Sequence, residues 1–198
     1  LLLTTALMTG RAVAQTDDFA DGNDTGWTRF APVGPLGGTS FSFPGGGYRI
    51  TCQPTPNPGS YGPARGGSLR MDTTYANFCT MVDVIDFNPA EDASVGLLAR
   101  VQPGPGAGTL SGYAMTYQTA DDEIEINKVT SEVPDRVSNS VHVSLVPGQS
   151  YRFVFYGIGS RLTARIYNLA NLALPLVEET AIDETWTTGT TGVRSEER

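Results

Sequence analysis

The sequence is poor in the side chains that most enzymes use for covalent or acid-base chemistry. It contains two cysteines and a single histidine, His142. A Ser-His-Asp or Cys-His site would have to be built on His142, and neither a G-x-S-x-G elbow nor a reactive-cysteine motif accompanies it. Two cysteines without a second Cys or His pair also argue against a zinc site. We therefore expect His142 to be a solvated residue on the polar face of its strand.

Basic residues and long apolar runs are scarce as well. Lys and Arg number 13 against 21 Asp and Glu, which gives a formal net charge of −8. No basic patch is present that could neutralise phosphates, so a nucleic-acid partner is not expected. The apolar run 1–8 is too short to span a bilayer. The glycine-rich runs 45–47 and 104–108 lack the strand-to-helix setting of a phosphate-binding loop and are interpreted as turns.

The chain begins with LLLTTALMTGRAVA, an apolar run that closes with Ala12-Val13-Ala14. Small residues at these places are typical of a signal-peptidase site, so 1–14 is interpreted as a signal-peptide remnant and 15–198 as one domain. The protein is then expected to be secreted or displayed at a cell surface. Two alternatives for 1–14 stay open, namely a first strand of the fold and a strand donated to a neighbouring subunit.

The clearest pattern in the chain is the alternation from Tyr151 to Tyr167, YRFVFYGIGSRLTARIY. Apolar side chains stand at every second position on both sides of the segment 157–160, which contains two glycines. A period of two places each apolar series on one face of a sheet, and glycine allows a tight reversal, so the pattern predicts a β-hairpin. Because a two-stranded ribbon is marginally stable alone, other strands have to cover its apolar face.

The composition favours strands and turns throughout the chain. There are 23 glycines and 13 prolines, charged residues make up 17%, and no stretch has sustained helical periodicity. Alternation predicts further strands within 41–51, 77–87, 95–101, 111–119, 123–130, 140–146 and 177–182. About ten to twelve short strands separated by turns predict an all-β fold, a two-sheet antiparallel sandwich.

Three segments are less regular. Segment 53–67 is rich in proline and glycine and is expected to be an ordered loop, whereas 77–87 is apolar on both faces and is expected to be a central strand. TTGTTGV at 187–193 resembles the approach to a closing strand, but 194–198, RSEER, is too charged for a buried one. We therefore expect the chain either to be truncated at its carboxyl end or to leave its last strand as an exposed edge.

Several segments together resemble the concanavalin A-like lectin/glucanase superfamily, specifically the laminin-G-like jelly-roll domains of exported bacterial proteins. They are DDFADGNDTGW, FSFPGGGYRI, the pair GLLARVQ and GYAMTY, YRFVFYGIGSRLTARIYN, and TTGTTGV. The resemblance implies a jelly-roll sandwich. Members of the superfamily bind glycans or proteins, some hydrolyse polysaccharides, and many are adhesive or spacer modules, so the likeness leaves the function open. A structural calcium ion is common among them.

The acidic loop near the start of the chain is a candidate calcium site. From Asp21 onward it reads D-x-N-x-T-G, which matches the opening of a calcium loop. Pro32 stands where an EF-hand has its glutamate, so an EF-hand is excluded. The remaining interpretations are a calcium ion held by Asp17, Asp21, Asn23 and Thr25, and a simple Asx-type turn.

The two cysteines, Cys52 and Cys79, lie in strand-like segments that follow one another in the sequence. Export would favour a disulfide between them. Closing that loop would stabilise the fold by roughly 3 to 4 kcal/mol in the chain-entropy model. The alternative is two buried thiols.

One strand carries alternating polar residues that resemble a catalytic motif. Laminarinase-type glucanases of the superfamily have E-x-D-x-E on one strand, and this chain has Glu123, Glu125 and Asn127 at the matching positions. The resemblance implies Glu123 as nucleophile and Glu125 as its helper, but Asn127 stands at the acid/base position. An amide cannot supply the proton that a retaining mechanism needs. An exposed polar strand face is the preferred interpretation, and a glycan hydrolase ranks third among the functions.

The sequence therefore predicts a non-catalytic extracellular recognition module that binds carbohydrate or attaches to a cell surface. Its expected partner is an extracellular glycan or a surface protein. Aromatic faces and polar side chains recognise sugars, and the candidate residues are Tyr61, Arg65, Tyr113, Tyr117 and Trp186. The alternative is a structural subunit of an extracellular assembly, in which the amino-terminal segment of one chain completes the sheet of the next by strand complementation.

Overall fold

The computed structural model describes residues 15–31, 38–52, 64–88, 93–104 and 109–197. In this part the chain forms fourteen β-strands and a short 3-10 turn, η2 (Pro44–Gly46). None of the described residues forms a helix that is long and apolar enough to cross a membrane. The predicted all-β class is confirmed. Segment 1–14 and Tyr61 lie outside the described residues.

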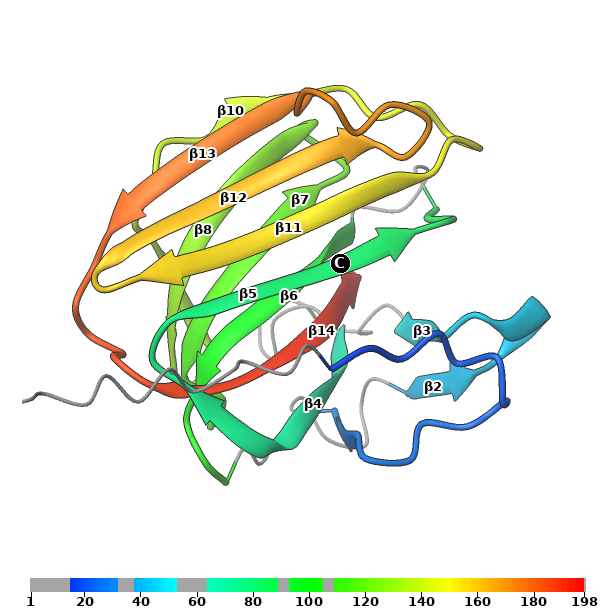
Figure 1. Cartoon of the computed structure of the whole chain (residues 1–198), viewed down its shortest axis with the longest axis horizontal. Coiled ribbons are helices and arrows are strands. Elements are labelled where there is room, and N and C mark those ends of the chain that lie inside the picture. Colours follow the sequence, from blue (N-terminus) through cyan, green and yellow to red (C-terminus); the bar gives the residue numbers. More distant parts are fainter. Residues whose placement is uncertain (1–14, 32–37, 53–63, 89–92, 105–108, 198) are drawn as a thin grey trace, which may run out of the picture.

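Two antiparallel sheets are stacked face to face (Figure 1). The large sheet contains, in spatial order, β1 (Thr28–Phe30), β4 (Ala64–Tyr75), β14 (Gly189–Glu197), β6 (Ala93–Val101), β7 (Gly112–Gln118), β8 (Glu123–Thr130) and β10 (Val141–His142), and β9 (Val133–Arg136) also pairs with β8. The small sheet contains β13 (Val177–Ile182), β12 (Arg161–Asn168), β11 (Tyr151–Ile158) and β5 (Phe78–Val84). A separate hairpin of β2 (Thr39–Ser42) and β3 (Arg49–Cys52) packs against β4 and β14. This arrangement is the predicted two-sheet sandwich.

The main hydrophobic core lies between the two sheets. The predicted hairpin forms β11 and β12, which reverse at Gly159 with a φ of +57°. Its buried side chains are Tyr151, Phe153, Phe155, Leu162, Ala164 and Ile166. The large sheet supplies Leu97, Tyr113, Met115, Tyr117, Ile124 and Ile126 to the same core. The hairpin prediction is confirmed, and so is its need for a covering layer.

Segment 77–87 does not form the central strand that its sequence predicts. It forms β5, which is the edge strand of the small sheet. Phe78 packs in the core, whereas Met81 is 55% exposed and Ile85 is 61% exposed. The segment thus has one buried face and one exposed apolar face. Local alternation does not distinguish this arrangement from a central strand that is buried on both faces.

The last strand is also placed differently from the prediction. β14 lies inside the large sheet and pairs with β4 on one side and β6 on the other, so it is not an exposed edge. Glu196 is buried, although the charge of this segment argued against burial. The physical reason is that its charged side chains meet opposite charges from other strands, as described below.

β4 follows a segment for which the sequence predicts a loop. Residues 64–67 of that segment belong to the strand, and its glycines allow neighbouring groups to approach closely. A Cβ at Gly66 would lie 2.2 Å from the side chain of Thr39, and one at Gly67 would lie 2.6 Å from the ring of Phe30. Glycine here serves packing against the sheet, not a reversal of the chain.

Candidate functional site

The outer face of the large sheet, turned away from the small sheet, carries an array of polar side chains. Alternation puts Ile124 and Ile126 of β8 in the core, so Glu125 and Asn127 point to the outer face. The strand register places Thr116 beside Glu125, and Gln118 beside Glu123. Glu125 is 6% exposed and Asn127 is 7% exposed. The prediction of one shared polar face is correct, but the prediction that this face is exposed is wrong for these two residues.

Glu125 is the centre of this array. Its Oε1 accepts hydrogen bonds from Gln118 Nε2 at 2.8 Å and from Asn127 Nδ2 at 3.0 Å. Its Oε2 lies 2.6 Å from Nε of Arg136, a side chain that is 47% exposed. Charge-assisted hydrogen bonds of this kind fix both partners in position. The result is a planar carboxylate with two amides beside it and one guanidinium that reaches solvent.

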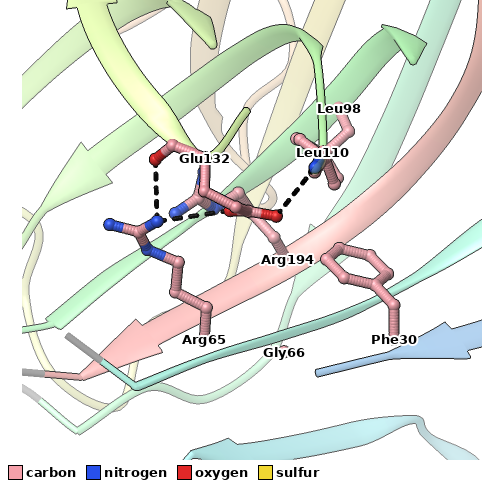
Figure 2. Close-up of a pocket in the computed structure, with 7 residues that line it drawn as sticks. All are labelled: Phe30, Arg65, Gly66, Leu98, Leu110, Glu132 and Arg194. Atoms are coloured by element: carbon pink, nitrogen blue, oxygen red, sulfur yellow. Dashed lines mark hydrogen bonds and ion pairs between the residues drawn. The ribbon is translucent and has the colours of Figure 1, made fainter. Parts of the chain in front are cut away.

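Four charged residues, Arg65, Glu132, Arg194 and Glu196, form a second group on the same face, and Figure 2 shows the first three. Arg65 Nη1 donates to the backbone oxygen of Glu132 at 2.8 Å and to its Oε2 at 3.2 Å, and Arg65 Nε lies 3.2 Å from Glu196 Oε2. Arg194 pairs with Glu196, and Glu132 Oε1 accepts the backbone N–H of Leu110. These four side chains are between 8% and 13% exposed.

Burial raises the pKa of Glu132, and the cations Arg194 and Arg65 oppose that rise. The pocket beneath this group is also lined by Phe30, Gly66, Leu98 and Leu110 and has no room for a water-sized molecule. We therefore assign Arg65, Glu132, Arg194 and Glu196 to a sealed ion-pair network that holds β4, β14 and the β8–β9 turn together. A ligand on this face would contact the side around Arg136.

The two tyrosines that the sequence predicts to contact a sugar lie in the hydrophobic core instead. Tyr113 is 0% exposed and donates its hydroxyl hydrogen to Asp183, and Tyr117 is 1% exposed and donates to Asp122 Oδ1 at 2.5 Å. Burial raises the pKa of Tyr113 to about 12 and also raises that of Tyr117. A sugar could not reach either ring, so the prediction of ligand contact is wrong for both. The alternation that places them on one face cannot say whether that face is inside or outside.

The two remaining described candidates are packed as well. Trp186 is half-buried against the main core, and Arg65 belongs to the ion-pair network. The sequence missed the carboxylate–amide array because Gln118, Glu125 and Arg136 come from three strands whose pairing is not a local property. The alternation of Glu123, Glu125 and Asn127 was the one signal that pointed to it.

The amino-terminal loop has the geometry of the Asx-turn alternative. Asp17, Asp21 and Asn23 each accept a backbone N–H two residues ahead through Oδ1, and Asp17 Oδ2 also accepts Trp27 Nε1 at 2.7 Å. In the described part of the chain, no three Asp, Glu, His or Cys side chains gather as metal ligands. A calcium ion held by Asp17, Asp21, Asn23 and Thr25 stays a prediction, and the hydrogen bonds of Asp17, Asp21 and Asn23 fit the Asx-turn interpretation.

Aromatic packing is what holds this loop in place. Phe19 stacks on Tyr48 with ring centroids 4.6 Å apart, and Phe43 stacks on the same ring at 5.3 Å. Asp24 accepts hydrogen bonds from Arg29 Nε at 2.6 Å and from Tyr48 Oη at 2.9 Å. The bond to Arg29 lowers the pKa of Asp24, and burial raises that of Tyr48 to about 12. The acids of the loop therefore orient its own backbone and its aromatic side chains.

The disulfide expected between Cys52 and Cys79 is not formed in the structure. Cys52 is buried in β3 and its Sγ–H donates to the backbone oxygen of Ser195 at 3.3 Å. Cys79 is exposed in β5. β3 and β5 belong to different sheets, although they come close together in the order of strands along the chain.

No family model matches the sequence, and no curated protein sequence does either. Solved structures share its architecture. The carbohydrate-binding module CBM66 from Bacillus subtilis has a TM-score of 0.62 and 14% identity, over 89% of this chain and 94% of that one. The chain has the concanavalin A-like jelly-roll fold.

Other structures with this fold agree. The Ca²⁺-bound exoplasmic/lumenal domain of VIP36 has a TM-score of 0.57 and 11% identity, over 91% of this chain and 82% of that one. Lectin II from Ulex europaeus has a TM-score of 0.57 and 13% identity, over 91% of this chain and 87% of that one. At such identities the likeness concerns the concanavalin A-like fold and not a shared activity.

Proposed function

We propose that this protein is a non-catalytic glycan-recognition module. The observation that carries the proposal is the carboxylate–amide array of Gln118, Glu125, Asn127 and Arg136 on the outer face of the large sheet. Neutral sugars present hydroxyl groups that both donate and accept. The half-exposed guanidinium of Arg136 and the partly exposed amide of Gln118 are the groups that a sugar would reach, and the buried Glu125 and Asn127 hold them in position. The carbohydrate-binding module and lectins that share the fold support the same proposal.

The same array argues against a hydrolase. Asn127 stands where the related glucanases have their acid/base, and its amide carries no transferable proton. Both oxygens of Glu125 are engaged by Gln118, Asn127 and Arg136. A carboxylate held in this way orients neighbouring donors. The case against a hydrolase therefore rests on Asn127, because the resemblance makes Glu125 only the helper of Glu123.

Finer features extend the proposal. Within the fold we place the chain among the laminin-G-like domains of exported bacterial proteins, acting outside the cell on a glycan or a glycan-bearing surface protein. Self-assembly by strand addition would not use β14, which is already paired on both sides. Among the described strands it would use an edge, β13 or β5 of the small sheet or β1 or β10 of the large sheet.

A glycan array followed by titration calorimetry tests the function. We expect Arg136→Ala to weaken binding of a glycan that the array identifies roughly tenfold, because the exposed guanidinium is lost and Glu125 loses its partner. The control is Arg152→Ala on the outer face of the small sheet, where Arg152 is paired with Asp83 in a similar ion pair. If no glycan on the glycan array binds, the proposed function is contradicted. If Arg136→Ala and Arg152→Ala weaken glycan binding equally, the placement of the site on the outer face of the large sheet is contradicted.

A further inference from the structure

An open cavity lies at the end of the β11–β12 hairpin opposite its turn, and none of its lining residues belongs to the carboxylate–amide array. It measures about 530 Å³ and is lined by Gln149, Ser150, Asn168, Leu169 and Ala170. Gln149 and Ser150 come directly before β11, and Asn168 ends β12 (upper right in Figure 1). The cavity is shallow and widely open, and Gln149 and Ala170 in its lining are exposed, so one ring of a small ligand would rest against it with its other side in water.

The two amides in this cavity are fixed by the protein. Asn168 Nδ2 donates to Gln149 Oε1 at 3.1 Å, and Asn168 Oδ1 accepts the backbone N–H of Ala170 at 2.9 Å. The backbone N–H of Leu169 donates to the oxygen of Ser150 at 2.9 Å, which extends the hairpin ladder by one pair. Local hydrogen bonds thus set the direction of both side-chain amides.

Several donors in the cavity are left over. An amide nitrogen carries two hydrogens and a hydroxyl can both donate and accept. Within the described part of the chain, Gln149 Nε2 and the Ser150 hydroxyl make no hydrogen bond, and Asn168 Nδ2 uses one of its two hydrogens. Hydrogen bonds hold the two amides in place, so their unused N–H groups are suited to bind the oxygens of a ligand in place of water.

The lining residues also define the chemical class of the ligand. None of the described residues that line the cavity is charged, so they offer no counter-ion to a charged group. Leu169 and Ala170 provide an apolar side that could face C–H groups. We propose that this cavity is a second subsite, which takes one uncharged hexose unit of a glycan. This inference rests on the proposed function and adds a second glycan contact, separate from the carboxylate–amide array.

Nuclear magnetic resonance with ¹⁵N-labelled protein tests the subsite. D-glucose, D-galactose and D-mannose are the probes, and weak binding in the millimolar range is expected because one small ligand gains few contacts. We expect at least one sugar to shift the signals of Asn168, Leu169 and Ala170. Gln149→Leu should weaken that binding at least fivefold, and Ser150→Ala at least twofold.

The matched control is Gln15→Leu, which removes the same group from an exposed position beside Asp72 of β4, outside the carboxylate–amide array. It should leave the shifts at Leu169 and Ala170 unchanged. Unchanged binding in both Gln149→Leu and Ser150→Ala, or no shift at the cavity with any of the three sugars, would overturn the subsite. If the glycan array still identifies a glycan whose binding depends on Arg136, the proposed function survives the loss of the subsite. If no glycan binds on the glycan array but a sugar shifts the signals at the cavity, the subsite survives and the proposed function fails.

Discussion

Arg100 shows how much structure one side chain can hold together. It is 2% exposed in β6, and it donates hydrogen bonds to backbone oxygens of Ala76, Gly159 and Trp186 at 2.6 to 3.0 Å. These oxygens belong to the β4–β5 turn, the β11–β12 turn and the β13–β14 connection. Burial lowers the pKa of Arg100, yet the planar guanidinium can satisfy three separate segments at once.

Arg100→Lys should lower the free energy of unfolding by about 3 kcal/mol, because a lysine has one nitrogen and would leave buried carbonyl oxygens without donors. Urea denaturation of the protein measures the change. Arg161→Lys in β12 is the control, since Arg161 is exposed. A loss within about 0.5 kcal/mol of the control would show that the carbonyl oxygens find other donors.

At the scale of the element, β14 explains how a charged strand can lie inside a sheet. Val193 and Ser195 point toward the inner side, whereas Arg194 and Glu196 share the outer face with Arg65 of β4. Burial of a charge is costly unless it is paired and hydrogen-bonded, and here cations and carboxylates come from three elements. The rule that charged segments avoid the interior therefore does not apply once the partners are present.

The amino-terminal loop gives a prediction about calcium. The melting temperature with calcium should differ from that with a chelator by no more than about 1 °C. The loop oxygens are already bonded to backbone and indole N–H groups, and a ligand stabilises only the state that binds it. Asp21→Ala serves as the comparison variant. A rise of several degrees that is lost in Asp21→Ala would instead establish a structural calcium ion in this loop.

At the scale of the whole molecule, buried tyrosines predict a loss of stability in alkali. Burial raises the pKa of Tyr48 and Tyr113 to about 12. A raised pKa in the folded state means that stability is complete below the unfolded value near 10 and is lost as the pH rises toward 12. For Tyr113, which is fully buried, a shift of two units corresponds to at most about 2.7 kcal/mol.

Urea unfolding at about pH 9 and about pH 11.5 measures this loss. We expect the free energy of unfolding to fall between the two, and to fall less in Tyr113→Phe. That variant also loses the hydroxyl that bonds Asp183 and the backbone N–H of Trp186, so its stability at the lower pH should drop by about 1 to 3 kcal/mol. An identical alkaline loss in both proteins would show that other groups cause it.

Much of the fold could be predicted from alternation alone. The bounds of β13 agree with the predicted segment 177–182, and β11 and β12 occupy the predicted hairpin. Alternation also placed Tyr113 and Tyr117 on one face, but not the side on which that face lies. β4 escaped prediction because its glycines and charges resemble a loop until Thr39 and Phe30 are packed on it.

The sequence by itself determined the class, the turns and the side chains that share a strand face, because a period of two and the special backbone freedom of glycine are local properties. Tertiary structure alone decided which faces are covered and which charges are paired. Arg65 and Glu132 meet although 67 positions separate them along the chain. Burial and charge pairing depend on such distant partners, so local patterns could not reveal the sealed ion pairs, the carboxylate–amide array or the amide-lined cavity.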